Sequence, residues 1–273
     1  MREYKLKFLK RLIVAVIFIP LLLFIAYSEN QLFSFIFSII VITGSIFEIY
    51  RIFRIKLGFY YIFTFLLAFS NLFYIYKNKE FNPFFLIILA GFMLIYEVFL
   101  YNKREKRDFK RLLIIFFSNI YINLFFSYFL LMKVKFFDSS KFALLFFISV
   151  WVIDSSAYFV GMTLAKKEHR GVMKVSGKKS IEGFLAGIII PTILFVFFRG
   201  MFYLNILHAI GFMVAFSVAV QLGDLTQSLI KRYADVKDSS SLIAGHGGIF
   251  DRFDSMIFSM PFFYLLVRLI YSF

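Results

Sequence analysis

Residues 31–50 read QLFSFIFSIIVITGSIFEIY and contain a single charged side chain, that of Glu48. A helix of about 20 apolar residues is long enough to cross the hydrocarbon core of a bilayer. The rest of the chain has a similar composition, because 61% of its 273 residues are hydrophobic, 22% are aromatic and only 17% are charged. Soluble domains are about 45–50% apolar and about 25% charged. The composition therefore excludes a soluble globular protein and predicts an all-α polytopic membrane protein.

Further apolar blocks lie on both sides of this stretch and predict about nine transmembrane helices in total. The basic N-terminal residues followed by an apolar run resemble a secretory signal, but no small-x-small cleavage site follows, so we expect an uncleaved first span. The predicted spans are residues 12–27, 31–50, 58–76, 82–101, 112–132, 142–163, 184–204, 206–229 and 256–273.

Lysine and arginine residues are distributed unevenly between the segments that join these spans. If the N-terminus lies inside, 24 of the 31 basic residues fall in cytoplasmic segments. Cytoplasmic loops retain positive charge, so the pattern predicts a cytoplasmic N-terminus and an external C-terminus. The same loops would attract the anionic headgroups of membrane lipids. Because the net charge of +15 is confined to segments between apolar blocks, it does not indicate a nucleic-acid partner.

Loop length and composition divide the chain further. The predicted cytoplasmic segments 164–183 and 230–255 are long and rich in Gly, Ser, Lys and Asp, whereas the external loops are short. We therefore predict an N-terminal transmembrane scaffold (1–111), a middle span with an external loop (112–141) and a C-terminal catalytic region (142–273). The chain has no cysteine, which excludes disulfides and thiolate metal ligands.

Besides Asp224, near the end of the eighth span, three acidic residues lie within predicted spans, where an ionisable group is costly and by default indicates a function. Asp154 lies deep in the sixth span, where it is either functional or a polar group satisfied by neighbouring hydroxyls. Glu48 and Glu97 lie near cytoplasmic span ends, where a carboxylate can reach water. We therefore interpret these two glutamates as structural.

Acidic and basic residues are concentrated between residues 224 and 254. Asp224, Ser228 and Lys231 are spaced to share one helix face, and Asp251 and Asp254 would share another if the next helix begins before them. Carboxylates from two helix ends suit a hard cation such as Mg²⁺, which also bridges phosphates. We predict metal ligation by Asp224 and Asp251, with Asp254 supporting the same face; a set of interfacial ion pairs is the alternative.

Residues 228–254 resemble the C-terminal signature of the phosphatidate cytidylyltransferase, or CDP-diacylglycerol synthase, family. That signature runs Ser-x-hydrophobic-Lys-Arg-x4-Lys-Asp, then a spacer, then His-Gly-Gly-hydrophobic-x-Asp-Arg-hydrophobic-Asp. The stretches 154–161 and 176–183 are also similar to the family, and the detailed resemblance covers about residues 151–255. Gly177 and Ala244 replace prolines that are usual in the family, which removes a fixed φ at each position.

The resemblance implies a bacterial-type inner-membrane enzyme with its active site facing the cytoplasm. Such an enzyme condenses CTP with phosphatidic acid to CDP-diacylglycerol and pyrophosphate, with Mg²⁺ and room for a second cation, and it is compatible with a homodimer. His246 is either a general base or a residue of the turn. The candidate catalytic residues are Asp224, Lys231, His246, Asp251 and Arg252. The candidate contacts to CTP, phosphate or the lipid headgroup are Asp154, Ser176, Lys178, Lys179, Ser180, Glu182, Ser228, Arg232, Lys237, Asp238, Gly247 and Gly248.

Two other functions are compatible with the residues. A related CTP-dependent enzyme acting on a different membrane lipid phosphate would need the same headgroup-binding residues. A transporter could also place charged residues between spans. The long loops rich in Lys, Asp and Gly, and the lack of an evident inverted repeat, count against a transporter.

Overall fold

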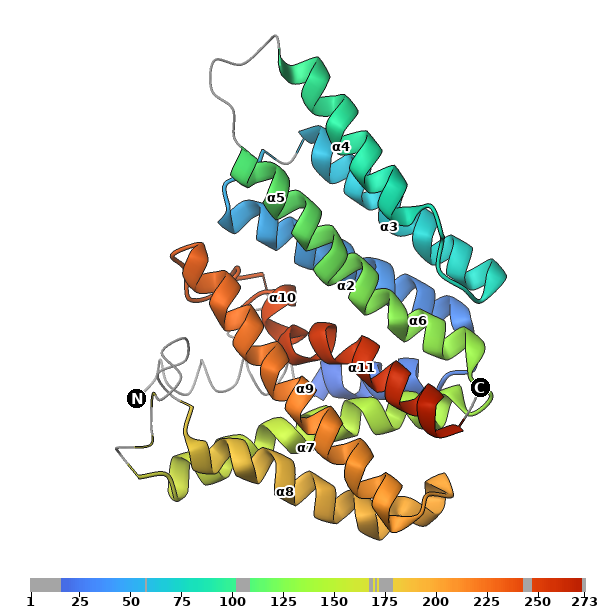
Figure 1. Cartoon of the computed structure of the whole chain (residues 1–273), viewed down its shortest axis with the longest axis vertical. Helices are drawn as coiled ribbons and strands as arrows, with labels where there is room; N and C mark the ends of the chain where they lie inside the picture. The colour runs from blue at the N-terminus through green and yellow to red at the C-terminus, as the bar shows by residue number, and fades with distance from the viewer. Residues whose placement is uncertain are drawn as a thin grey trace. The chain divides into compact units, whose positions relative to one another are not determined.

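The computed structural model describes residues 16–56, 58–101, 109–166, 169, 171, 179–242 and 247–271, and every regular element within these ranges is helical. The first described helix is Val16–Tyr27. The helices that follow, labelled in Figure 1, are α2 (Gln31–Ile52), α3 (Gly58–Asn78), α4 (Phe85–Tyr101), α5 (Phe109–Ser118), α6 (Phe125–Lys135), α7 (Ser139–Thr163), α8 (Ile181–Phe198), α9 (Ile206–Tyr233), α10 (Ile249–Arg252) and α11 (Asp254–Tyr271). Between α5 and α6 lies the π-helical segment Asn119–Leu124, and after α8 the 3₁₀ turn Arg199–Phe202.

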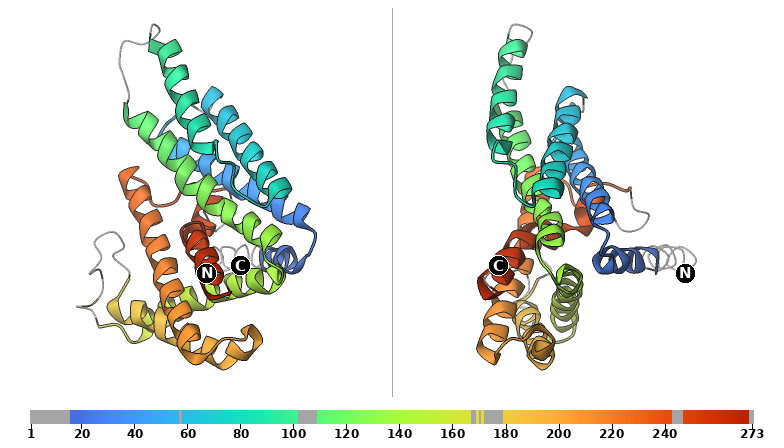
Figure 2. Two further views of the ribbon diagram at one scale, coloured as in Figure 1. Left: turned by 45° about the vertical axis from the view of Figure 1, so that its right-hand side comes forward. Right: turned by 90° about the vertical axis from the view of Figure 1, so that its right-hand side faces the viewer.

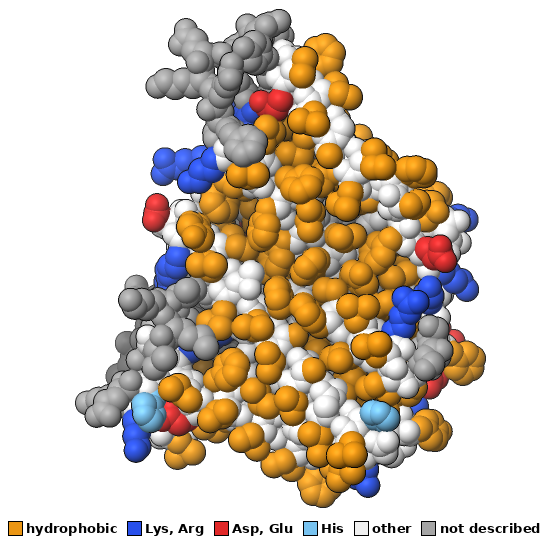
Figure 3. Space-filling view, viewed as in Figure 1, with side chains coloured by type: hydrophobic (Ala, Val, Ile, Leu, Met, Phe, Trp, Pro, Cys, Tyr) orange, Lys and Arg blue, Asp and Glu red, His pale blue; other side chains and the backbone are white. Residues whose placement is uncertain are grey.

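Seven helices in the described ranges are long and apolar enough to cross a membrane, and two apolar helices, Val16–Tyr27 and Phe85–Phe99, are shorter. On the face shown in Figure 3, hydrophobic side chains cover most of the surface, and charged side chains lie mainly at its margins. The all-α membrane architecture predicted from composition is therefore confirmed, and the chain is an integral membrane protein. The count of nine spans and the orientation of the termini stay predictions.

The chain forms two compact units that interleave in sequence. The first unit is made of Met1–Ile17, Ser28–Ser139 and Asp238–Arg252. The second unit is made of Phe18–Tyr27, Ser140–Lys237 and Phe253–Phe273. Residues 238–252 of the motif belong to the first unit, and the other described motif segments belong to the second.

In the first unit, α2 packs against α3, α6 and the short α10, and α3 also packs against α4. The α5–α6 segment runs as one long rod beside α2, as Figures 1 and 2 show. The buried hydroxyl of Tyr50 lies 2.9 Å from that of Thr64, and the Asn119 amide donates to both oxygens. Because buried polar groups need partners in an apolar interior, this cluster fixes α2, α3 and the rod in one register.

In the second unit, α9 packs against both α8 and α11. The rings of Phe146, Phe216 and Phe263, from α7, α9 and α11, have centroids 4.9–5.7 Å apart. Such edge-on and tilted contacts are favoured between aromatic rings. They hold these three helices together and thereby position the polar residues that lie toward one end of the unit.

Candidate active site

The loop that carries the Gly-Gly-x-x-Asp part of the motif is held in the first unit by Glu48 of α2. Glu48 is 0% exposed. Its Oε1 accepts hydrogen bonds from the Ser240 hydroxyl at 2.7 Å and the Ile249 amide at 2.9 Å. Its Oε2 accepts from the Ser239 hydroxyl at 2.7 Å and the Phe250 amide at 2.9 Å. Since the first amides of a helix have no partner within it, Glu48 caps α10 from a distant part of the chain.

Asp251, which lies in α10, also holds the conformation of this loop. Its Oδ2 accepts from the Gly248 amide at 3.0 Å and from the Ser239 amide at 2.8 Å. Asp251 is the third residue of α10, and its carboxylate accepts a hydrogen bond from the backbone amide of Gly248, the residue just before the helix. This bond is one half of a capping box. The hydroxyl of Ser239 lies 2.9 Å from the same Asp251 oxygen. Ser239 is therefore placed between the two carboxylates that shape the loop.

Close packing explains why glycine occupies two positions around this loop. A Cβ at Gly248 would overlap the Glu48 carboxylate and the Ser239 hydroxyl. On α2, one turn before Glu48, a Cβ at Gly44 would lie 2.6 Å from the side chain of Ile249. Gly44 and Glu48 thus present one face of α2 to α10, because residues four apart share a helix face.

Glu48 is a residue that the sequence interpretation undervalued. The prediction that its carboxylate reaches water is wrong, because it is buried and fully engaged with a loop about 190 residues later. The interpretation considered only its nearness to a span end. The combination of a lone carboxylate with a glycine four residues earlier is the signal that indicates a close approach at this face.

In the second unit, Lys179 and Asp224 form an ion pair, with 2.5 Å between Nζ and Oδ2. Their side chains are 28% and 33% exposed, respectively. Lys179 precedes Ser180, the N-cap of α8, whose hydroxyl accepts from the Gly183 amide at 3.1 Å. This cap fixes the start of α8 and so fixes where Lys179 meets α9.

The backbones of α7 and α8 approach closely at the beginning of α8. A Cβ at Gly183 would lie 2.7 Å from the carbonyl oxygen of Ala157 and 3.3 Å from Cα of Gly161. The glycines that end the 154–161 and 176–183 stretches therefore pack against each other. Small residues permit such close helix contacts within a membrane. The contact brings the Ser180 turn against α7, the helix that carries Asp154.

Asp154, Asp224 and Asp254 come from three helices of the second unit. The Ser255 hydroxyl donates to Asp154 Oδ2 at 3.3 Å, and Asp224 and Asp254 are close enough to interact electrostatically with Asp154. Their carboxylate oxygens are the donor type that a hard divalent cation prefers. Within the described ranges, however, no group of three acidic or histidine side chains is arranged to hold a metal ion. The donor chemistry fits the predicted Mg²⁺, and metal ligation by these residues stays a prediction.

The shared face predicted on α9 is present, because the helix continues without a break from Ile206 to Tyr233. Asp224, Ser228 and Lys231 are all partly exposed along it, next to the buried stripe of Gly223, Gln227 and Ile230. Asp224 therefore lies more than two turns before the helix end rather than closing the helix.

The condition for a common face of Asp251 and Asp254 is not met. Helix α10 ends at Arg252, the chain bends at the buried Phe253, and α11 begins at Asp254. Asp254 accepts from the Ser255 amide at 2.8 Å, and a carboxylate at a helix start is favoured by the helix dipole. The expectation of one helix through both aspartates is therefore wrong, and the two residues belong to different units.

The other candidate residues divide into those described and those outside the described ranges. Glu182, in the first turn of α8, accepts from His169 Nδ1 at 2.5 Å if that nitrogen carries the proton. Gly247 has φ 81°, a left-handed conformation that suits glycine. Exposed side chains at the end of α9 and on the motif loop belong to Arg232, Lys237, Asp238 and Arg252. Ser176, Lys178 and His246, with Gly177 and Ala244, lie outside the described residues.

Comparison with known proteins places these features in a family. The sequence model described as the cytidylyltransferase family matches residues 9–270. A Bacillus subtilis protein named phosphatidate cytidylyltransferase is 40% identical over 154 residues, which cover 55% of this chain and 56% of the relative. Proteins of the same name from Haemophilus influenzae and Aquifex aeolicus are 43% identical over 123 residues and 35% identical over 153 residues.

The alignments with these two relatives cover 43% and 56% of this chain, and 42% and 57% of the relatives. The chain thus aligns with about half the length of the curated relatives that it matches. The family match is far longer and includes all of the segments from which the candidate site is built. On this evidence the chain belongs to the cytidylyltransferase family.

Proposed function

We propose that this protein is a phosphatidate cytidylyltransferase, which transfers the cytidylyl group of CTP to phosphatidic acid and releases pyrophosphate. The observation that carries the proposal is the 40% identity over 154 residues to a relative of that name. The motif residues support the same chemistry, since they combine carboxylates, lysines and a glycine turn in a membrane protein. We place the active site on the cytoplasmic side of the membrane, as the distribution of basic residues predicts. The membrane is a bacterial inner membrane, as the family resemblance implies.

The reaction needs no nucleophile from the protein. An oxygen of the lipid phosphate attacks the α-phosphorus of CTP, a new P–O bond forms, and the bond from that phosphorus to the bridging oxygen of pyrophosphate breaks. The lipid phosphate is already an anion, so a dedicated general base is not required. In-line phosphoryl-type transfer depends mainly on positioning and on compensation of negative charge.

The basic residues supply that compensation. Lys179 is held by Asp224 at the start of α8, and Lys231 lies two turns further along the Asp224 face of α9. Lys179 and Lys231, with Arg232 and Lys237, would neutralise the two polyanionic substrates, which otherwise repel each other. Arg252 directly follows Asp251 in the sequence. Its planar guanidinium group would add hydrogen-bond donors for phosphate oxygens. The Glu48 and Asp251 hydrogen bonds keep the Gly247–Gly248 turn in a single conformation for substrate.

The carboxylates would hold the divalent cation. Asp224, Asp251 and Asp254 are the proposed Mg²⁺ ligands, with room for a second cation. When bound, Mg²⁺ supplies charge stabilisation for the departing pyrophosphate. The ion pair with Lys179 would keep the Asp224 carboxylate oriented while no cation is present. A homodimer, which the family resemblance implies, is also part of this proposal.

A substrate panel tests the assignment. Purified protein is incubated with CTP labelled at the α-phosphorus, Mg²⁺ and one lipid phosphate at a time, either phosphatidic acid or a polyprenyl phosphate, and the lipids are separated by chromatography. We expect label in CDP-diacylglycerol with phosphatidic acid. Label in the polyprenyl product alone would assign the enzyme to another lipid phosphate, and label in neither would contradict cytidylyl transfer.

A further inference from the structure

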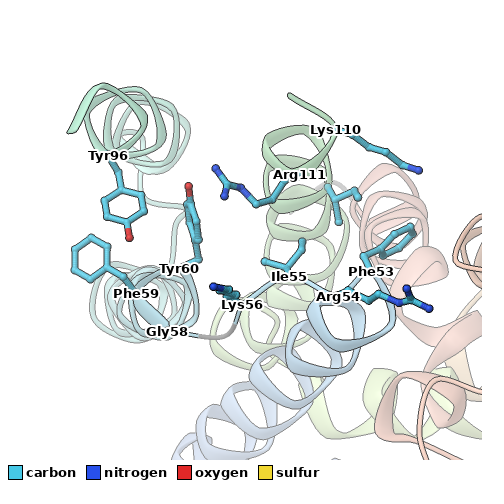
Figure 4. Close-up of a pocket in the computed structure, with 11 residues that line it drawn as sticks. Phe53, Arg54, Ile55, Lys56, Gly58, Phe59, Tyr60, Tyr96, Lys110 and Arg111 are labelled. Atoms are coloured by element: carbon cyan, nitrogen blue, oxygen red, sulfur yellow. The ribbon is translucent and has the colours of Figure 1, made fainter. Parts of the chain in front are cut away.

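A cavity of about 580 Å³ lies in the first unit, at the turn where α2 gives way to α3 (Figure 4). Its walls are the turn itself (53–56), the start of α3 (58–60), Tyr96 of α4, and the Lys110–Ile114 part of α5. None of these residues belongs to the motif segments. The volume is in the range of sites that hold small ligands or headgroups.

Four cationic side chains line this cavity: Arg54, Lys56, Lys110 and Arg111. Arg111 is paired with Glu97, and its guanidinium also lies over the Tyr60 ring, 5.2 Å from the centroid. The Tyr60 hydroxyl donates to Glu97 as well. Within the described part of the chain, the other three cations form no ion pair. Among the described residues, the cavity therefore has more positive than negative charge.

The side chains in Figure 4 have an ordered arrangement. Arg111 extends toward the face of Tyr60 and Lys56 lies below that ring, while Arg54 and Lys110 extend away from Tyr60, on either side of Phe53. Tyr60 is 4% exposed, so its ring forms a fixed wall, and the Glu97 ion pair holds Arg111 in place beside it. Lys56 is thus the unpaired cation on the aromatic side, and Lys110 and Arg54 are the unpaired cations at the rim.

The backbone of the turn has a conformation that is unusual for a residue with a side chain. The Arg54 amide donates to the Arg51 carbonyl at 3.1 Å and the Ile55 amide to the Tyr50 carbonyl at 2.8 Å, the two bonds of a Schellman motif. The left-handed residue of this motif is usually glycine, but here it is Arg54, with φ 55°. A side chain at such a position costs about 1–2 kcal/mol. Lys79, Tyr203 and Asp235 also have positive φ, so this conformation by itself assigns no use to the charge of Arg54.

We propose that this cavity binds the phosphate-bearing headgroup of an anionic membrane phospholipid. The ligand is a lipid because the cavity lies at the ends of membrane helices and has aromatic walls. The adjoining side chains face outward as lipid-contacting residues do, with Phe59 49% and Leu113 52% exposed. The cations bind the headgroup phosphate, while Phe59 and Tyr96 contact the glycerol backbone and the first acyl carbons. This proposal does not depend on cytidylyl transfer.

Charges that only orient the chain in the membrane would not need this geometry. Topogenic lysines and arginines act through their number on one side of the membrane. That role does not account for the ion pair that fixes Arg111 beside Tyr60. Juxtamembrane cations attract anionic lipid by about 1 kcal/mol each, and enclosure beside an aromatic wall makes the attraction site-specific.

The test uses the full chain in phosphatidylcholine nanodiscs that contain a phosphatidylglycerol with a photoreactive group near its glycerol backbone. Phosphatidylglycerol is chosen because it is not the proposed substrate. Crosslinked peptides are mapped by mass spectrometry, and the affinity for phosphatidylglycerol is measured by titration. A parallel arm adds inorganic phosphate or glycerol 3-phosphate as a soluble competitor.

Two sets of variants sharpen the measurement. Lys56→Gln combined with Lys110→Gln removes two cavity cations and keeps polar side chains. Arg54→Gly removes a third cation and relieves the left-handed backbone. Lys79→Gly is its matched control, because Lys79 is also left-handed, with φ 58°, and lies beyond the far end of α3, about 30 Å away by helix length.

The expected result is crosslinking at residues 53–60 and 110–114 and a roughly tenfold or greater loss of affinity in the double variant. Arg54→Gly should lose about fivefold, while Lys79→Gly stays within about twofold. The proposal is overturned if the crosslinks spread evenly over the membrane helices or if the double variant binds as the unmodified chain does. Competition by soluble phosphate at similar concentration would assign the cavity to a phosphate ion and would also overturn the lipid assignment.

Discussion

Glu48 is the single residue on which the conformation of the motif loop most depends. Four donors converge on a carboxylate that water does not reach, two from serine hydroxyls and two from the α10 amides. A carboxylate can accept all four bonds, whereas an amide side chain cannot, because its nitrogen carries only donors. The charge of Glu48, and not only its size, therefore matters for the loop.

We predict that Glu48→Gln destabilises the protein by about 1–3 kcal/mol, because one pair of buried donors loses its acceptor. Limited proteolysis of the 238–252 loop should become faster, and cytidylyl transfer should fall by about tenfold or more as the loop loses its geometry. Glu80→Gln is the control, since Glu80 is exposed in the loop after α3. Equal melting temperature and equal proteolysis in Glu48→Gln and the unmodified chain would contradict the role given to Glu48.

The Lys179–Asp224 pair should matter for activity but, unlike Glu48, contribute little to stability. Both side chains are about a third exposed, and such ion pairs contribute about 1 kcal/mol or less to stability. Asp224→Asn should therefore leave the melting temperature nearly unchanged while it lowers transfer by about a hundredfold or more, because it weakens the field that holds a cation. Asp235→Asn, the same change at an exposed residue just after α9, should leave transfer unaltered. Comparable activity in both variants would remove Asp224 from the proposed site.

At the level of elements, the contact between α7 and α8 depends on glycine. A Cβ at Gly183 would meet the Ala157 carbonyl at 2.7 Å, so Gly183→Ala should push α8 away and cost about 1–3 kcal/mol. On α9, Gly211 has no atom within 4 Å of the corresponding position, and Gly211→Ala should be neutral or stabilise the helix by up to about 1 kcal/mol. Thermal unfolding of both variants in the same detergent checks the contrast, which a similar loss in each would refute.

The helices themselves could be predicted from the sequence because their signal is local. Apolar stretches and span length depend on neighbouring residues alone, so α2, α3 and α7 begin and end within about three residues of the predicted boundaries. The break at Phe253 was not foreseen, because it arises where one buried aromatic side chain separates α10 from α11. The fourth span begins at Phe85, three residues later than predicted, and its helix ends at Tyr101.

The site was only partly predictable because some of its contacts join distant parts of the chain. The spacing of Asp224, Ser228 and Lys231 correctly predicts a shared helix face, since that depends only on helical periodicity. Gly44 and Glu48 indicate a close approach at one face of α2, but that Ser239 and Ser240 are the partners of Glu48 depends on how α2 packs. The basic turn at Arg54 was interpreted through its charge alone, and its left-handed backbone emerges only in the structure.

At the scale of the whole molecule, the central expectation is that the motif segments face the cytoplasm. In the first unit, the 238–252 loop and the basic cavity lie at the same end of α2, near Glu48 and Arg54. That end is the one for which the basic residues predict a cytoplasmic location. Each unit is built from three separate segments of the chain, so the orientation of the chain in the membrane has to be tested in both units.

Cysteine labelling tests this topology directly, because the chain has no native cysteine. In intact cells, a membrane-impermeant thiol reagent should label a cysteine at Lys79, in a predicted external loop, but not one at Lys237. After the membrane is permeabilised, both positions should react. Labelling of the Lys237 position from outside intact cells would reverse the orientation.

The most direct measurement for the whole account is cytidylyl transfer itself, made side by side with the unmodified chain and Asp224→Asn in vesicles of the same composition. Both proteins receive phosphatidic acid, Mg²⁺ and CTP labelled at the α-phosphorus, and the labelled lipid is counted over time. The account predicts steady accumulation of labelled CDP-diacylglycerol with the unmodified chain and a rate lower by about a hundredfold or more with Asp224→Asn. No labelled lipid from the folded, membrane-inserted unmodified chain, or equal rates from the two proteins, would contradict it.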